Sequence, residues 1–144
     1  MKQIYNSLLK KQIELHEGLR LKPYKCPAGK LTIGIGRNID DNGITKDEAF
    51  YLLDNDLQEC EKSCRDLNWY SELSDTRKCV IIELCFNIGF AGLKKFKKMI
   101  EAIERKDWTV AAYEMLDSEW AVQVGKRAQT MAEQFRKDLY EIKK

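Results

Sequence analysis

Apolar positions along most of this chain recur at the spacing of amphipathic helices, and one early stretch departs from it. Residues 2–17 and 46–65 each carry apolar side chains near one helical stripe. Between these segments, Leu31, Ile33 and Ile35 alternate with small or polar residues, which predicts a strand that turns its apolar side chains into a small core. The pattern therefore predicts a mainly helical protein with a small β-element near its N-terminus.

The β-element is predicted to be a hairpin. Residues 24–26 and 31–35 are its expected strands, and residues 27–29 are the turn between them. Proline suits the first corner of a type I turn, and the glycine that ends the loop suits the left-handed position. This loop length places Cys26 and Thr32 on one face as diagonal neighbours. We expect that face to be open to water and the opposite face to be buried.

Glu17 is expected to end the first helix just before the hairpin, with Gly18 as its left-handed cap residue. An acid, a thiol and a hydroxyl around one groove would support acid–base chemistry. A helix cap followed by an ordinary surface hairpin would give the same pattern, so the pattern leaves both interpretations open. His16 points about 100° away from Glu17 around the helix, which argues against its pairing with Cys26.

The residues of this stretch resemble the signature of phage-type lysozymes, glycoside hydrolase family 24. The matching positions are Glu17, Gly18, Arg20, Tyr24, Gly29, Thr32, Ile33, Gly34, Ile35 and Gly36. Cys26 stands where the best-known members carry Asp, although some phage endolysins of the family also carry Cys. The resemblance implies an α+β, mainly helical lysozyme-like fold whose small N-terminal lobe holds a hairpin or three-stranded sheet. It also implies that Glu17, Cys26 and Thr32 are catalytic.

The resemblance continues into the C-terminal half. Residues 79–88 are apolar almost all round, which predicts a central buried helix. Asn87 matches a position beside the family's cleft, where it would bind substrate; a helix C-cap amide is the alternative. Arg127 matches an arginine that pairs with the catalytic acid, which implies an ion pair with Glu17. Trp120 matches a residue that packs beneath the active site.

A single domain is expected over residues 1–144, because this length suffices for one core and no Pro/Gly-rich linker interrupts it. Thr45 and Glu48 form a capping box that begins a helix. The expected parts are a β-containing lobe at 18–45, a connecting helix at 46–65, and a helical lobe formed by 66–144 together with 1–17.

Further expectations concern the segments around these parts. Ile44 is expected in a short third strand after an Asn-Gly turn. Residues 93–105 are expected to form a helix of their own. The final helix is expected to close on the core through Met131, Phe135 and Leu139.

The charge and composition of the chain limit which molecules it can bind. The net charge of +2 excludes a strongly basic nucleic-acid binder but permits an anionic polymer such as peptidoglycan. The five cysteines show no CxxC spacing and the chain has one histidine, so we expect reduced thiols and neither a metal site nor a cofactor. No stretch approaches the ~20 apolar residues of a membrane span, and the first residues lack the apolar run of a signal peptide. Together with these features, the resemblance to phage lysozymes implies a monomer that waits in the host bacterial cytoplasm until a holin releases it to the periplasm and cell wall.

The resemblance implies a bacteriolytic phage endolysin that cleaves the β-1,4 bond between N-acetylmuramic acid and N-acetylglucosamine. Glu17 would protonate the leaving oxygen, while Thr32 and Cys26 hold and orient a water on the opposite face of the sugar. That is inversion, the family's known outcome, and it requires about 6.5–9.5 Å between acid and base. Attack by Cys26 itself, with retention, is the alternative mechanism.

Three other functions are weighed against this one. A lytic transglycosylase would use Glu17 alone and leave 1,6-anhydro ends. A non-catalytic wall-binding module would keep the fold, and the cysteine at position 26 is the one feature that favours it. A cysteine protease built on Cys26 is disfavoured, because the histidine is badly placed and no orienting third group is visible.

Overall fold

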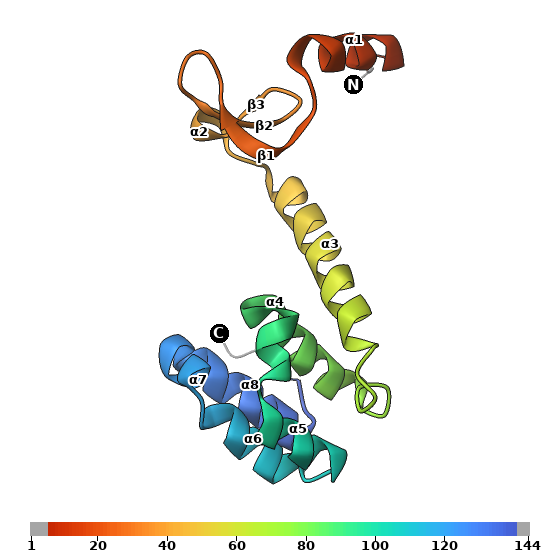
Figure 1. Ribbon diagram of the computed structural model, residues 1–144, viewed down its shortest axis with the longest axis vertical. Helices are drawn as coiled ribbons and strands as arrows, with labels where there is room; N and C mark the ends of the chain where they lie inside the picture. Colours follow the sequence, from red (N-terminus) through yellow and green to blue (C-terminus); the bar gives the residue numbers. More distant parts are fainter. Residues whose placement is uncertain (1–5, 141–144) are drawn as a thin grey trace. The chain divides into compact units, whose positions relative to one another are not determined.

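The computed structural model describes residues 6–140, and Figure 1 shows helices α1–α8 with one small sheet. The elements follow in the order α1 (Ser7–Glu17), β1 (Arg20–Lys25), β2 (Leu31–Gly34), β3 (Arg37–Asn38), α2 (Ile39–Asn42), α3 (Lys46–Cys64), α4 (Asp75–Lys94), α5 (Lys97–Glu104), α6 (Trp108–Leu116), α7 (Glu119–Val124) and α8 (Lys126–Lys137). This order confirms the expected α+β, mainly helical fold class.

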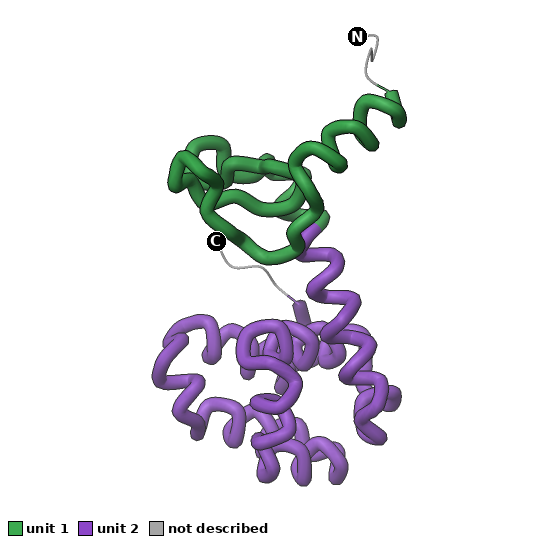
Figure 2. Tube along the Cα trace, turned by 45° about the horizontal axis from the view of Figure 1, so that its top comes forward, with its two compact units in different colours: residues 1–51 green, residues 52–144 purple. Residues whose placement is uncertain are grey.

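The chain divides into two compact units, Met1–Tyr51 and Leu52–Lys144 (Figure 2). Helix α1 and the sheet belong to the first unit, and helices α4 to α8 belong to the second. Helix α3 begins in the first unit and continues into the second. Within residues 6–140, none of the helices combines the length and the apolar character that crossing a bilayer requires.

Both ends of helix α1 are capped locally. The Asn6 side chain accepts a hydrogen bond from the Leu9 N–H at 3.0 Å, which satisfies one of the free donors of the first turn. At the other end Gly18 has φ 79° and donates its N–H to the Glu14 carbonyl at 2.7 Å. The expected cap glycine is therefore confirmed, whereas residues 2–5 of the expected helix lie outside the described residues.

The three-stranded sheet has the antiparallel order β1-β2-β3. Strand β1 pairs with β2 so that Tyr24 faces Thr32 and Lys25 faces Leu31, which is the register that a three-residue loop imposes. The Gly29 N–H donates to the Cys26 carbonyl at 2.8 Å, and Gly29 has φ 80°. The predicted turn is therefore confirmed.

The remaining boundaries of the sheet differ from the prediction. Strand β1 begins at Arg20, four residues early, and β2 ends at Gly34. The third strand is Arg37–Asn38, so the placement of Ile44 in a strand is wrong. The reason is local: the Asn38 side chain accepts the Asp41 N–H at 3.0 Å and begins helix α2, which leaves no room for a longer strand.

The faces of the hairpin are also not buried as expected. Leu31 is 37% and Ile35 is 44% exposed, whereas Thr32 on the other face is 3% exposed. The expectation of a wet Thr32 and a buried apolar face is therefore wrong. Strand β2 is four residues long, and helix α2 lies beside it in Figure 1, so an unpredicted neighbour decides which side chains are covered.

The capping box that begins α3 is present. The Thr45 N–H donates to Glu48 Oε1 at 2.8 Å, and the Glu48 N–H donates to Thr45 Oγ1 at 3.1 Å. Helix α3 ends at Cys64, one residue before the expected end.

Helix α4 is the buried central helix of the second unit. Ser74 caps it by accepting the Arg77 N–H at 3.2 Å, and a kink at Gly89, with φ 82°, interrupts it. The buried side chains of α4 include Val80, Ile81, Leu84, Cys85 and Leu93.

Two predictions about the later helices are wrong. Helix α4 continues to Lys94 and α5 covers only Lys97–Glu104, so residues 93–105 are not one helix. Met131 and Phe135 are buried as expected, but Leu139 is 51% exposed. Helix α8 ends at Lys137 because Asp138 adopts a left-handed conformation, which carries Leu139 off the core-facing stripe.

Candidate active site

The Glu17 carboxyl group lies against the backbone of Gly36, in the turn that follows strand β2. A β-carbon added to Gly36 would fall 2.7 Å from Glu17 Oε2 and 2.9 Å from its Cδ. Gly36 also has φ 74°, a conformation that side-chain-bearing residues rarely adopt. The backbone of position 36 therefore favours glycine, and a β-carbon there would in addition displace the flexible end of the Glu17 side chain.

Cys26 lies at the opposite end of strand β2, beside the turn of the first hairpin. Its N–H donates to the Lys30 carbonyl at 2.9 Å. Hydrogen bonding from the Lys30 backbone is the main cause that lowers the pKa of the Cys26 thiol; removal of water opposes it, and a bond from the Ala28 backbone adds to it. A larger fraction of the Cys26 thiol is therefore ionised near neutral pH than in an ordinary cysteine.

Thr32 and Cys26 share one acceptor. The Thr32 hydroxyl donates to the Lys30 carbonyl at 2.9 Å, and the same carbonyl accepts the Cys26 N–H. A hydroxyl carries one proton, so when Thr32 gives it to Lys30 its oxygen remains an acceptor toward other groups. The structure thus brings the predicted thiol and hydroxyl together, as the strand register implies.

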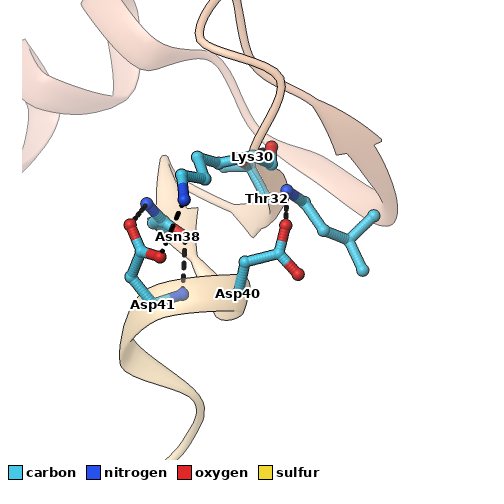
Figure 3. A network of polar contacts seen from close by, with 6 residues as sticks. Lys30, Thr32, Asn38, Asp40 and Asp41 are labelled. Carbon is cyan, nitrogen blue, oxygen red and sulfur yellow. Dashed lines mark hydrogen bonds and ion pairs between the residues drawn. The ribbon is translucent and has the colours of Figure 1, made fainter.

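A polar network braces this hairpin against helix α2 (Figure 3). Lys30 Nζ contacts Asp41 Oδ1 at 3.1 Å, and Asn38 Nδ2 donates to Asp41 Oδ2 at 2.9 Å. The Leu31 N–H donates to Asp40 Oδ2 at 2.6 Å. The sequence prediction missed both aspartates, because it assigned this stretch to a turn and a strand. An asparagine followed three residues later by an acid is an N-cap signal that would have indicated the helix.

Asn87 is exposed on α4, two residues before the kink. Its Oδ1 accepts the Trp120 indole N–H at 2.5 Å, and Trp120 is 6% exposed. The backbone of α4 leaves the helical conformation at Gly89, so Asn87 lies in the last turn of the segment before the kink, and its substrate-binding and C-cap interpretations both stay predictions. Trp120 packs in the core with its edge toward Phe96, at 6.3 Å between ring centroids.

Arg127, near the start of α8, pairs with a carboxylate of its own unit. Its Nε lies 3.0 Å from Glu83 Oε2, and both side chains are partly exposed. Glu17 belongs to the other unit. The ion pair between Arg127 and Glu17 that the resemblance implies therefore stays a prediction.

Known proteins resemble this chain over most of its length. The phage lysozyme family model matches residues 14–138. A probable T4-type lysozyme 2 of Dictyostelium discoideum is 29% identical over 153 residues, covering 85% of this chain and 89% of that protein. An endolysin of Acyrthosiphon pisum secondary endosymbiont phage 1 is 30% identical over 119 residues, covering 80% of each. The pre-baseplate central spike protein Gp5 of Enterobacteria phage T4 is 28% identical over 155 residues, covering 85% of this chain and 26% of Gp5.

Proposed function

Because this chain belongs to the phage lysozyme family and is a peptidoglycan hydrolase, we propose that it cleaves the β-1,4 bond between N-acetylmuramic acid and N-acetylglucosamine. The observation that supports this proposal most is the placement of candidate groups at both ends of strand β2. Glu17 lies against the turn that follows the strand, and Cys26 and Thr32 meet at the Lys30 carbonyl that precedes it.

The length of β2 favours an inverting reaction. A strand of four residues spans roughly 10 Å at about 3.3 Å per residue. Inverting glycosidases need about 6.5–9.5 Å between the acid and the group that activates water, so that the water fits between them. A separation of that size exceeds the about 5 Å between the two carboxyl groups of a retaining pair, which is how the strand length supports inversion.

Glu17 acts as the general acid in this proposal. It gives its proton to the glycosidic oxygen as the bond to the anomeric carbon breaks. Glu17 is an exposed residue, as contact with a polymeric substrate requires. Glu17→Gln keeps the shape of the side chain but has no proton to give, so hydrolysis should fall by about a hundredfold or more.

Thr32 and Cys26 act on the water in this proposal. Thr32 is 3% exposed, so in this proposal its oxygen accepts a hydrogen bond from a single water at that small opening. The Cys26 thiolate, favoured by the surrounding amides, takes or attracts a proton of that water. A Cys26→Ser variant that retains most activity would exclude covalent attack by sulfur. NMR of the fresh product separates the mechanisms independently, since a β-anomer released first from the β-linked substrate indicates retention.

Asn87 and Arg127 are the proposed substrate-binding residues. The Asn87 oxygen is bonded to Trp120, so its amide N–H groups are the part we assign to substrate carbonyl or hydroxyl groups. Arg127 would provide positive charge for an anionic wall polymer or for Glu17. Substitution of either residue is expected to raise KM more than it lowers kcat.

Digestion of purified peptidoglycan with the wild type and Glu17→Gln tests the function. Mass spectrometry of the muropeptides should show reducing ends carrying the elements of water with the wild type and almost none with the variant. Products lighter by one water would instead indicate the lytic transglycosylase. Binding to the wall without cleavage by either protein would indicate the non-catalytic module, which the cysteine at position 26 favours.

Release by a holin is a further part of the proposal, supported by the endolysin relative. Expression inside a bacterium should leave cells intact until a membrane-permeabilising protein is co-expressed. Lysis without such a partner would contradict this step. A monomer is expected by light scattering.

The assignment of residues 1–17 to the helical lobe is also a proposal. Leu8 is 75% and Leu15 is 78% exposed on α1, and packing of this helix on a lobe would bury them. Their double replacement by serine should then lower the melting temperature, whereas a double replacement of the exposed Lys11 and Gln12 by serine should not. An unchanged melting temperature for the leucine variant would contradict the assignment.

A further inference from the structure

One peptide group, between Lys30 and Leu31, is hydrogen-bonded on both sides. Its N–H belongs to Leu31 and donates to Asp40 Oδ2 at 2.6 Å. Its carbonyl belongs to Lys30 and accepts the Thr32 hydroxyl and the Cys26 N–H, each at 2.9 Å. The carboxylate of Asp40 is therefore linked to both proposed water-activating residues through a single amide. Figure 3 shows Asp40 beside Lys30 and Thr32.

The hydrogen bond to Asp40 changes the strength of the Lys30 carbonyl as an acceptor. A hydrogen bond from an N–H to a carboxylate is short and strong because the acceptor carries charge. It withdraws the N–H proton toward the acid and polarises the amide, so the carbonyl oxygen becomes a better acceptor. The effect of Asp40 at the carbonyl is to hold the hydroxyl proton of Thr32 more firmly.

We propose that Asp40 is a positioning residue for the hydrolysis: acting through the Lys30–Leu31 peptide, it commits the Thr32 proton to the Lys30 carbonyl. Thr32 Oγ then meets the attacking water as an acceptor. A water that donates one proton to this oxygen turns a lone pair toward the sugar. The inference rests on the proposed function, because it concerns how the water of that reaction is oriented.

The neighbouring Asp41 does not share this position. Its carboxylate contacts the Lys30 ammonium at 3.1 Å and the Asn38 side-chain amide at 2.9 Å, and both contacts are with side chains. Figure 3 shows the two acids on the same short helix. Asp41 therefore provides a matched control of equal charge, element and exposure that lacks the bond to the Leu31 amide.

The inference predicts a spectroscopic signature that needs no substrate. In the wild type, the Leu31 amide proton should resonate at low field, as charge-assisted hydrogen bonds do. Asp40→Asn should move this resonance upfield, whereas Asp41→Asn should move it less. A Leu31 proton at an ordinary position in the wild type overturns the inference without any variant having to fold.

The kinetic test compares the same variants on purified peptidoglycan. Asp40→Asn should lower kcat by about tenfold and leave KM within about twofold. A tenfold change in kcat is what the loss of one hydrogen bond to a charged group can cause. Asp40→Glu, which restores the charge, should recover part of kcat, and Asp41→Asn should stay within about twofold of the wild type.

The outcomes separate this inference from the proposed function. Equal losses in Asp40→Asn and Asp41→Asn, or a loss that appears only in KM, overturn the positioning role. If Glu17→Gln hydrolyses peptidoglycan as fast as the wild type, the proposed mechanism fails, and the positioning role fails with it even where the Leu31 signature is present. An upfield Leu31 shift together with a selective loss of kcat in Asp40→Asn supports the inference.

Discussion

Arg37 and Glu48 form a bidentate ion pair that joins strand β3 to the first turn of helix α3. The guanidinium places one nitrogen 2.7 Å from Glu48 Oε2 and another 3.0 Å from Oε1. The second nitrogen also donates to the Gly43 carbonyl at 3.1 Å. This arrangement connects the end of the sheet to the helix that leads out of the first unit, so it secures the strands that carry Thr32.

Acid should weaken this connection in a defined pH range. The Arg37 hydrogen bonds, with help from Thr45, lower the pKa of Glu48 from 4.5 to about 2. A lowered pKa means that Glu48 contributes stability above pH 4.5 and that the contribution is lost as the pH falls toward about 2.

Urea unfolding at several pH values tests this prediction. The stability difference between the wild type and Glu48→Gln should be constant above pH 4.5 and should shrink below it. Asp47→Asn removes a carboxylate from the same helical turn and leaves the Arg37 contact intact, so it serves as the control. A difference that stays the same down to pH 2.5 would contradict the assignment.

Alanine at position 36 should cost activity as well as stability. The added β-carbon would lie 2.7 Å from Glu17 Oε2, so the acid must move away. A displacement of about 1 Å at a reacting group can cost about a hundredfold in rate. We expect hydrolysis by Gly36→Ala to fall at least tenfold below that of a properly matched control.

Gly34→Ala is that control. Gly34 has φ 72°, similar to Gly36, but a β-carbon there meets nothing within 4 Å. Both variants should lose stability through backbone strain of about 1 kcal/mol. Equal activities of the two variants, normalised to folded protein, would show that the Glu17 carboxyl does not depend on Gly36.

Cys26 should be alkylated before the thiols of the helical core. Its pKa is lowered, chiefly by the Lys30 backbone, whereas burial raises the pKa of Cys60 and of Cys64 to about 11. Because the thiolate is the reactive form, iodoacetamide at pH 7.5 should modify Cys26 fastest of these three. Peptide mapping by mass spectrometry follows each site, and loss of activity should parallel modification of Cys26. Preferential labelling of Cys60 or Cys64 would contradict the structure.

Arg77→Lys should destabilise the helical unit. The Arg77 guanidinium lies 4.1 Å from the centre of the Trp108 ring and donates its Nε–H to the Phe135 carbonyl at 2.7 Å. Lysine lacks the planar group that stacks and donates at once, so we expect a loss of about 1–3 kcal/mol in the free energy of unfolding. Urea denaturation measures it, with the exposed Arg105→Lys as control. A loss no larger than that of the control would show that the stacked geometry contributes little.

Features that depend on a few neighbouring residues were predictable from the sequence. The loop at 27–29 follows from a proline and a glycine at the two positions where their backbone preferences are needed. The cap at Thr45 is equally local, since its side chain bonds to an N–H three residues away. The register of β1 and β2, and with it the meeting of Cys26 and Thr32, follows from the loop.

The sequence alone thus determined the helical class, the hairpin and the pairing of its thiol and hydroxyl, because turn and cap chemistry acts over three or four residues. Tertiary structure decided what surrounds them. Asp40 reaches the Leu31 amide only because helix α2 folds back beside β2, and Arg127 reaches Glu83 across 44 positions of the chain. Burial of Thr32 and exposure of Leu31 were also decided by tertiary structure. A side chain is covered by the segment that packs on it, and the local sequence pattern does not show which segment that is.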